Sequence, residues 1–451
     1  MRKMLSVPGW VSRFLVRAKR EDGAVAVQFA LLIVPMTVMV FGAIDVSRAS
    51  GEKARLQDAL DAATLAAARS TETTDAGLKT VGDKVLSADL AASKAVLASS
   101  TYRLEGTKII ATARASMTTS IANLWMDGDM TVGATSEVTR SSNNLEVALA
   151  LDVTGSMGGS RIADLKLAAK DLVDLVVQDQ QTPYYTKVAL VPYSAAVNVG
   201  SYAASVRGAA TAGICTSPGC ASYKFTNASG SLKTFAISNC VTERTGGNAY
   251  TDAAPSSTFL GRNYPSSANP CLTSTITPLS TDRAALKTRI DGLSASGSTA
   301  GHIGLAWGWY MVSPNFASLW PTASQPAAYG ADRLLKVVVL MTDGAFNTTY
   351  CKGVISQDSG NGSGAASDHI NCNAPNGDAF SQARSLCSNM KAQGVIIYTV
   401  GFDVGSDASA EAIVRECATD AEHVYLPATG AALKTAFRAI GEDISRLRIS
   451  K

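Results

Sequence analysis

The residues with the clearest chemical potential lie in LEVALALDVTGSM, residues 145–157. An apolar run rich in β-forming residues ends at Asp152, and the hydroxyl residues Thr154 and Ser156 follow it. Hard divalent cations such as Mg²⁺ and Ca²⁺ prefer oxygen ligands, and Mg²⁺ often keeps positions for water or a partner's ligand. We therefore predict a cation-binding turn. The alternative is structural: Asp152 caps the following helix, and Ser156 is a turn residue.

Two more residues extend this candidate metal site. Thr299 lies in the Gly-rich segment GSTAGHIGLA, and Asp343 follows the apolar run KVVVLM. Asp152 and Asp343 both stand at the ends of expected strands, where open parallel sheets bind their ligands. We expect Mg²⁺ as the cation, with Ca²⁺ and Mn²⁺ as alternatives.

Strands and helices are expected to alternate after residue 144. Continuous Val/Ile/Leu runs predict a mostly parallel sheet covered by helices on both faces, an α/β fold. The expected strands are 145–152, 187–193, 336–342, 395–401 and 423–426, and the expected helices are 161–178, 281–293, 301–312, 378–392, 409–418 and 430–448. In the helix 301–312, Trp307 and Trp309 are expected to pack in the core. His302 is expected to be a loop or helix-start residue, with a place at the edge of the candidate metal site as the alternative.

Two insertions, at about 200–275 and 351–377, are rich in small polar residues and contain cysteines. An even cysteine count suggests disulfides in an oxidising compartment. The pairs expected from sequence order and helix placement are Cys215–Cys220, Cys240–Cys271, Cys351–Cys372 and Cys387–Cys417. Zinc is the competing explanation, but no CxxC pair occurs and the chain has only three histidines. Either surface decoration or partner binding explains the insertions.

The N-terminal part predicts a membrane anchor. Residues 1–22 form a basic segment, and the uncharged segment 23–44 is long enough to span a bilayer. The basic residues place the N-terminus in the cytoplasm and the bulk of the chain outside it. A cleaved signal peptide is the alternative, but the segment is too long and no clear cleavage site follows.

Beyond the membrane segment, residues 45–70 predict a helical stalk. Leu56, Leu60, Ala63 and Ala67 share one face of this helix, which indicates either a simple stalk or packing against a partner helix. Residues 71–143 predict a small α/β region. Its expected elements are a helix at 84–97, a turn at Gly106, and strands at 108–117 and 130–140.

Composition narrows the function further. The net charge of +3 is too small to indicate a nucleic-acid partner. Asp152 and Asp343 could support metal-assisted hydrolysis. However, no nucleophile–base pair or phosphate-binding loop accompanies them, so we predict neither an enzyme nor a small-molecule substrate.

The metal motif resembles the metal-ion-dependent adhesion site of von Willebrand factor A domains. The matching residues are Asp152, Thr154 and Ser156 in DVTGS, Thr299, and Asp343 in VVVLMTDG; the family's usual motif has Ser where Thr154 stands. The resemblance implies a von Willebrand A domain over 144–451, in which the cation accepts a carboxylate from a protein partner.

The N-terminal segment GAVAVQFALLIVPMTVMVFGAIDVSRA, with ARLQDALDAATLAAA, resembles the TadE/TadG proteins of the Flp, or tight-adherence, pilus system. This resemblance implies a role in assembling or anchoring pili of a Gram-negative bacterium, with pilus assembly components as partners. It also implies an anchor in the bacterial inner membrane, with the bulk of the chain in the periplasm. Gln28 stands where pilin-like precursors carry Glu, which favours a retained anchor. A surface adhesin is the alternative function, whereas a cytoplasmic chelatase-type role conflicts with the membrane segment and the cysteines.

Overall fold

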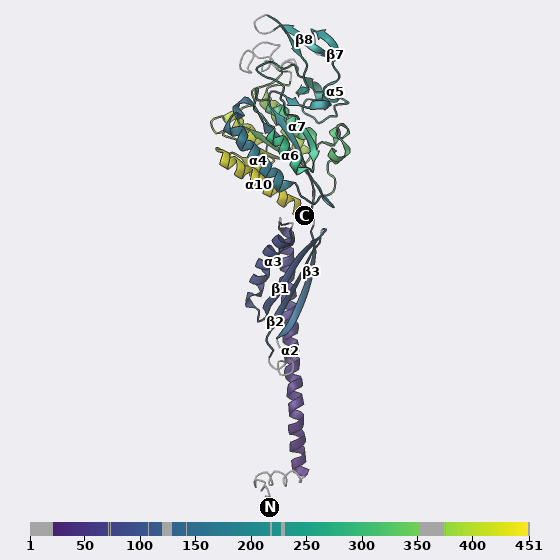
Figure 1. Cartoon of the computed structure of the whole chain (residues 1–451), viewed down its shortest axis with the longest axis vertical. Coiled ribbons are helices and arrows are strands. Elements are labelled where there is room, and N and C mark those ends of the chain that lie inside the picture. Colours follow the sequence, from purple (N-terminus) through teal and green to yellow (C-terminus); the bar gives the residue numbers. More distant parts are fainter. Residues whose placement is uncertain are drawn as a thin grey trace, which may run out of the picture. The chain divides into compact units, whose positions relative to one another are not determined.

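The computed structural model describes residues 21–70, 72, 74–106, 108–119, 129–140, 142–216, 219–226, 231–350, 374 and 376–449. The chain divides into two compact units, an N-terminal unit (Met1–Arg140) and a C-terminal unit (Ser141–Lys451), whose elements are labelled in Figure 1. The basic segment 1–20 and most of the insertion at 351–377, with Cys351 and Cys372, lie outside the described residues.

The N-terminal unit packs two helices against one sheet. Its elements are α2 (Glu21–Arg69), α3 (Asp75–Asp89) and the antiparallel strands β1 (Val96–Glu105), β2 (Lys108–Met117) and β3 (Met130–Thr139). Leu56, Leu60, Ala63 and Ala67 of α2 are fully buried in the core of this unit. The second half of α2 is therefore not a free stalk, because its buried face packs against α3 and the sheet of the same unit.

The first half of α2 has a different character. Within the described residues, one helix is long and apolar enough to cross a membrane; it covers Val27–Arg69 and contains an 18-residue window with a mean hydropathy of 2.2. Large apolar side chains such as Phe29, Leu31 and Met39 are exposed, the last by 72%. Because exposing so much apolar surface to water is unfavourable, this half is compatible with a membrane anchor.

The predicted helix at 84–97 is misplaced. The helix α3 begins at Asp75, where the Thr74 side chain accepts a hydrogen bond from the Gly77 amide at 3.1 Å, and it ends at Asp89. Residues from Val96 onward form β1, which pairs along β2. The strand pairing overrides the helix propensity of the Ala- and Leu-rich sequence.

The C-terminal unit is built on a six-stranded sheet in the order β12-β5-β4-β13-β14-β15. The strands are β4 (Asn144–Asp152), β5 (Thr186–Tyr193), β12 (Thr277–Ser280), β13 (Leu334–Thr342), β14 (Ile396–Gly401) and β15 (Val424–Tyr425). All pairs are parallel except β12 with β5, an antiparallel edge that the sequence did not predict. The α/β class and the five predicted strands are confirmed.

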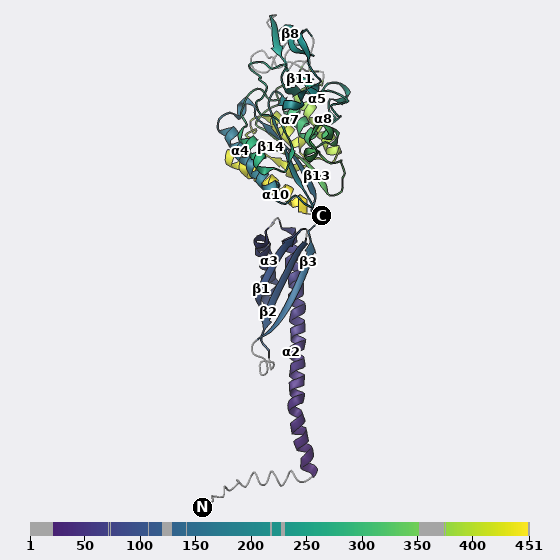
Figure 2. The same cartoon turned by 45° about the vertical axis from the view of Figure 1, so that its right-hand side comes forward.

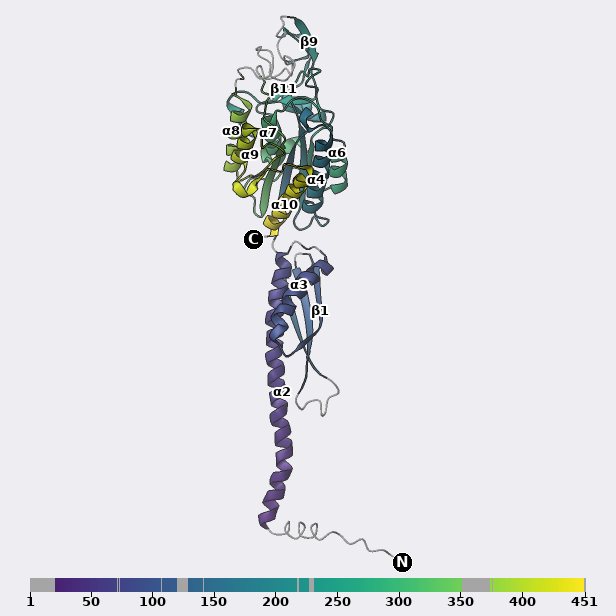
Figure 3. The ribbon, with the colours of Figure 1, turned by 90° about the vertical axis from the view of Figure 1, so that its left-hand side faces the viewer.

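Helices cover both faces of this sheet, as Figure 3 shows. The helices α4 (Ser160–Val176), α6 (Arg283–Asp291) and α10 (Gly430–Ile449) lie on one face, and α7 (Gly301–Val312), α8 (Ala379–Ala392) and α9 (Ala408–Cys417) lie on the other. Side chains along β4 alternate between the two: Val147 and Leu149 pack with α4, whereas Ala148 and Ala150 pack with α7.

Every residue of α7 is buried, including Trp307 and Trp309, which pack in the core as predicted. A Cβ atom added at Gly304 would lie 2.3 Å from the ring of Tyr193, and one added at Gly308 would lie 2.9 Å from Val338. Glycines at these positions therefore let α7 lie directly on the sheet. This close approach fixes the N-terminus of α7, where the Thr299 loop enters.

The insertion at 200–275 forms two small sheets, with β8 and β11 visible at one end of the C-terminal unit in Figure 2. One sheet consists of β10 (Cys240–Thr242), β11 (Gly261–Arg262) and β6 (Val197–Asn198), which lies just before the insertion. The other consists of β7 (Thr211–Cys215), β8 (Cys220–Thr226) and β9 (Leu232–Ala236), and a short helix, α5 (Ala203–Arg207), lies between β6 and β7 in the chain. Val206, Val241 and Leu260 belong to the same core cluster as α7. Part of this insertion therefore belongs to the core and is more than surface decoration, whereas most side chains of β7 and β9 are exposed.

Disulfides join Cys215 to Cys220, Cys240 to Cys271 and Cys387 to Cys417. These are the three expected pairs that fall within the described residues. Two of them tie the insertion together, and the third joins α8 to α9.

Candidate cation site

The candidate site lies at the carboxyl ends of two adjacent parallel strands. Asp152 is the last residue of β4, and Asp343 directly follows β13, its hydrogen-bonded neighbour. The turn after Asp152 contains a short 3₁₀ helix, Gly155–Met157, and Gly159 with φ of +73° then leads into α4. A positive φ favours glycine, so the sequence GSMGGS suits this sharp exit.

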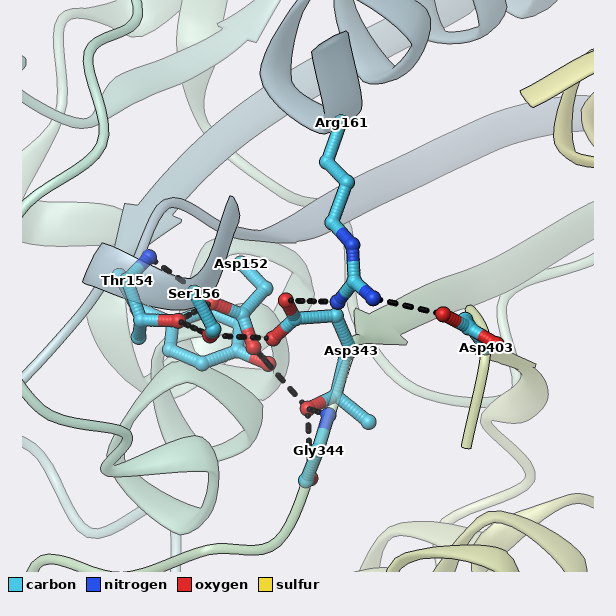
Figure 4. Close-up of polar contacts among 9 residues, drawn as sticks. Asp152, Thr154, Ser156, Arg161, Asp343, Gly344 and Asp403 are labelled. Atoms are coloured by element: carbon cyan, nitrogen blue, oxygen red, sulfur yellow. Dashed lines mark hydrogen bonds and ion pairs between the residues drawn. The ribbon is translucent and has the colours of Figure 1, made fainter. Parts of the chain in front are cut away.

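Four of the five predicted site residues are joined by a chain of hydrogen bonds, drawn in Figure 4. The Thr154 amide and hydroxyl donate to Asp152 Oδ1 at 2.9 and 2.6 Å. The Thr154 and Ser156 hydroxyl oxygens lie 3.0 Å apart, and the Ser156 hydroxyl donates to Asp343 Oδ1 at 2.8 Å. Two carboxylates and two hydroxyls, which come from segments far apart in the sequence, thus converge on one spot.

The fifth predicted residue, Thr299, is buried in the loop before α7. Its amide donates to Asn347 Oδ1 at 2.8 Å, and the Gly155 amide donates to the carbonyl of Gly297 at 2.8 Å. The loop that carries Thr299 is thus fixed beside the turn by backbone hydrogen bonds, while the side-chain network runs through the other four residues.

Asp152 does not cap the following helix. The cap of α4 is Gly159, without a side-chain hydrogen bond, and both oxygens of Asp152 are engaged inside the site. Asp152 Oδ2 accepts from the Thr342 hydroxyl at 3.0 Å and faces the Tyr193 hydroxyl at 3.4 Å. The structural explanation of Asp152 as a helix cap is therefore wrong.

The two carboxylates of the site influence each other electrostatically. Asp152 is fully buried, and burial, followed by the nearby charge of Asp343, raises the pKa of Asp152 to about 7. Within the described residues, no three His, Cys, Asp or Glu side chains cluster into a metal site. The ligands available to a cation here are the two carboxylates and the hydroxyls of Thr154 and Ser156, a donor set of oxygens alone that suits Mg²⁺, Mn²⁺ or Ca²⁺.

Sequence reasoning missed two charged residues at this site. Arg161, the second residue of α4, donates to Asp343 Oδ2 at 3.0 Å and to Asp403 Oδ2 at 2.6 Å, so its guanidinium bridges the two carboxylates (Figure 4). Asp403 follows the end of β14 by two residues, and its position at a strand end was a signal that could have identified it. No local pattern singles out Arg161.

His302 lies away from this network. It is buried, and its Nε2 lies 2.7 Å from Glu243 of the insertion. This contact links α7 to the segment after β10, so His302 has a partner in the core and is not a ligand at the site edge.

We expect the cation-free protein to lose stability as the pH rises. The folded state holds a proton on Asp152 up to about pH 7, whereas the unfolded chain releases it near its ordinary pKa of 3.8. The stabilisation is thus complete below about pH 4 and is lost as the pH rises through 7, by as much as about 4 kcal/mol. Urea unfolding with a chelator at pH 4 to 8 measures this, with Asp152→Asn as the comparison. The same pH slope in both proteins would contradict it.

Comparison with known proteins gives one family match, over the N-terminal segment. Residues 23–70 match the family model described as Putative Flp pilus-assembly TadE/G-like, which confirms the resemblance there. The match covers the apolar helix and its buried continuation and stops before the sheets. No curated protein sequence matches the chain.

Among solved structures, the neighbours include proteins of pili. The von Willebrand factor domain of the type V pili tip protein Mfa5 from Porphyromonas gingivalis is 14% identical, with 69% of this chain and 97% of that chain covered and a TM-score of 0.39. The tip pilin GBS104 from Group B Streptococcus agalactiae is 13% identical, with 67% and 100% covered and a TM-score of 0.40. The pilus adhesin SpaC from Lactobacillus rhamnosus GG is 12% identical, with 78% of this chain but only 34% of that chain covered and a TM-score of 0.36. Sequence identities and TM-scores this low do not support assigning the function of these proteins to this chain.

Proposed function

We propose that the protein is a membrane-anchored, non-enzymatic component of Flp-type pilus assembly or anchoring, and that its C-terminal unit is a von Willebrand A domain that binds a protein partner through a divalent cation. The observation that carries the binding mechanism is the chain of hydrogen bonds joining Asp152, Thr154, Ser156 and Asp343 at the strand ends. The family match over residues 23–70 supports the pilus role.

The donor set explains how a partner would be bound. A cation held by Asp152 and Asp343, with neutral hydroxyls from Thr154, Ser156 and Thr299, keeps much of its positive charge. It can therefore accept a carboxylate from a partner in an open coordination position. Mg²⁺ is the proposed ion, with Ca²⁺ and Mn²⁺ as alternatives.

The apolar first half of α2 and the basic residues before it in the sequence support an inner-membrane location. The apolar half would cross the inner membrane, and the basic residues before it would stay in the cytoplasm. The C-terminal unit would then lie in the periplasm, an oxidising compartment in which its three described disulfides would be stable.

The contacts of the histidines also agree with a binding role. His302 is bound to Glu243 and His423 to Asp420, so both described histidines already have carboxylate partners. The residues around Asp152 supply oxygen ligands and an arginine, which is a better set for holding an ion than for activating a nucleophile.

Capture of a partner tests the mechanism. The full chain, extracted in detergent after mild cross-linking in its own cells, should retain a specific protein that is lost with Asp152→Ala or with a chelator. The matched control is Asp291→Ala, which removes an exposed aspartate paired with Lys170. Undiminished capture by Asp152→Ala and in chelator would rule out the metal bridge, while loss with Asp291→Ala would indicate general damage.

The alternative function, a surface adhesin, uses the same cation site but requires exposure outside the cell. Labelling of intact cells with a membrane-impermeant reagent separates the two. Labelling of the C-terminal unit only after the outer membrane is opened supports the assembly role, and labelling of intact cells supports the adhesin.

A further inference from the structure

The cation site already contains a positive charge from the protein itself. The side chain of Asp343 is completely buried, and Arg161, 33% exposed, donates to its Oδ2 at 3.0 Å. The other oxygen, Oδ1, accepts from the Ser156 hydroxyl at 2.8 Å. Both oxygens of Asp343 are therefore occupied, one of them by a full positive charge.

The second partner of Arg161 lies on the outer side of the bridge. Asp403 is half exposed and accepts from Arg161 at 2.6 Å, while its own amide donates to the Pro427 carbonyl at 2.8 Å. The guanidinium also lies 5.7 Å from the centre of the Phe402 ring. Arg161 is thus held on its outer side by groups that take no part in the predicted ligand set.

We propose that Arg161 is a resident counter-cation that sets the affinity of this site for divalent ions. This inference rests on the proposed cation-binding function and names the residue that regulates it. Without a divalent ion, the guanidinium neutralises Asp343. When the ion binds, it competes for the same carboxylate, and Arg161 remains bound to Asp403.

The charges of Arg161 and Asp403 determine whether each substitution raises or lowers the affinity for the divalent ion. A monovalent guanidinium beside a divalent ion repels it strongly at short distance, and little solvent screens the inner carboxylate. Removing the charge of Arg161 should therefore raise the affinity for the ion. Removing Asp403 should lower it, because the guanidinium would then pair with Asp343 alone.

A purely structural role predicts the opposite result. If the Arg161 bridge only positions the start of α4, its loss should loosen the turn that carries Thr154 and Ser156. The affinity for the ion would then fall or stay the same. The sign of the change in affinity therefore distinguishes a counter-cation from a positioning salt bridge.

The test measures Mn²⁺ binding to the full chain in detergent by titration calorimetry. We expect Arg161→Gln to bind Mn²⁺ at least tenfold more tightly than the unchanged protein. Arg161→Lys keeps the positive charge but loses the guanidinium fork that reaches both carboxylates, so it should bind Mn²⁺ more weakly than Arg161→Gln does. Asp403→Asn should bind at least threefold more weakly, and its backbone should be unaffected because Asn tolerates the positive φ of 57° at this position.

The chain offers a matched control in Arg283, which is also 33% exposed, also starts a helix, and also pairs with two aspartates, Asp174 and Asp179. Arg283→Gln should leave Mn²⁺ affinity unchanged. As a second readout, Mn²⁺ should raise the melting temperature of Arg161→Gln by more than it raises that of the unchanged protein.

The outcomes separate this inference from the proposed function. If Asp152→Ala abolishes Mn²⁺ binding but Arg161→Gln leaves it unchanged or weakens it, the counter-cation role alone is overturned. Binding seen only after Arg161→Gln supports it strongly. Absence of Mn²⁺ binding and of any melting shift in both proteins overturns the cation site and the inference together.

Discussion

Replacing Asp152 with Asn should lower the affinity of the full chain for Mn²⁺ by at least about 100-fold, because even residues that only support metal ligands change affinity by about 10- to 100-fold. Asp152 is fully buried, so bulk water has no access to take the place of the lost carboxylate. Asp343→Asn should have a comparable effect, since it removes the other charged ligand of the proposed set.

The same substitution should have the opposite effect on the cation-free protein. The buried carboxyl of Asp152 lies close to Asp343, and both burial and that charge raise its pKa. The neutral amide of Asp152→Asn removes this penalty, so at pH 8 in chelator the melting temperature should rise while the stabilisation by Mn²⁺ disappears. Calorimetric titration and thermal unfolding measure the two effects.

Asp291→Asn is the control for this pair of measurements, because Asp291 is 58% exposed and pairs with Lys170 on the surface. It should change neither the Mn²⁺ affinity nor the melting temperature appreciably. Mn²⁺ affinity that is preserved in both Asp152→Asn and Asp343→Asn would show that these carboxylates hold no cation.

The sequence predicts the central sheet well for a physical reason. Strands buried on both faces need continuous apolar side chains, and LEVALALD and KVVVLMT have them. The ends of such runs are also visible, which is why Asp152 and Asp343 could be recognised and expected to meet. The edge strand β12 was missed because Thr277–Ser280 is short and contains a proline.

The small N-terminal sheet was harder to predict because its strands depend on partners. The segment before Tyr102 is rich in Ala, Ser and Leu and has no strong preference for a strand. It becomes β1 by pairing with β2, which no local pattern shows. The start of α3 had a visible signal, the capping residue Thr74, that the helix prediction did not use.

The charged bridge of the site depends on tertiary structure in the same way. Arg161 and Asp403 are 242 residues apart and meet only because α4 starts beside the end of β14. The insertion gives a second example: its composition is that of a surface loop, yet Glu243 reaches His302 inside the core. A small number of such long-range contacts decides which charged residues become part of a site.

Replacing Lys336 with Met should destabilise the C-terminal unit by about 3–5 kcal/mol, because it leaves a buried charge without its partner. Glu146 is completely buried at the other end of the sheet, and Lys336 Nζ donates to it at 2.5 Å and to the Val312 carbonyl at 2.8 Å. Burial lowers the pKa of Lys336, and the charge of Glu146 opposes this shift. The two residues face each other in register on β4 and β13.

The double variant Glu146→Gln with Lys336→Met should recover most of that loss. A Gln oxygen can still accept the hydrogen bonds that Glu146 receives from the Tyr185 hydroxyl at 3.0 Å and the Ala327 amide at 2.8 Å, and no unpaired charge remains. Urea unfolding followed by the fluorescence of the buried Trp307, Trp309 and Trp320 reports on this unit.

Lys170→Met is the matched control, because it breaks a surface ion pair that contributes only about 0–1 kcal/mol. If Lys336→Met costs no more than this control, the buried pair does not stabilise the sheet. If the double variant is no more stable than Lys336→Met alone, the loss comes from packing. The proposed cation site lies at one end of β4 and β13 and this ion pair at the other, so substitutions at the two ends test separate features of the C-terminal unit.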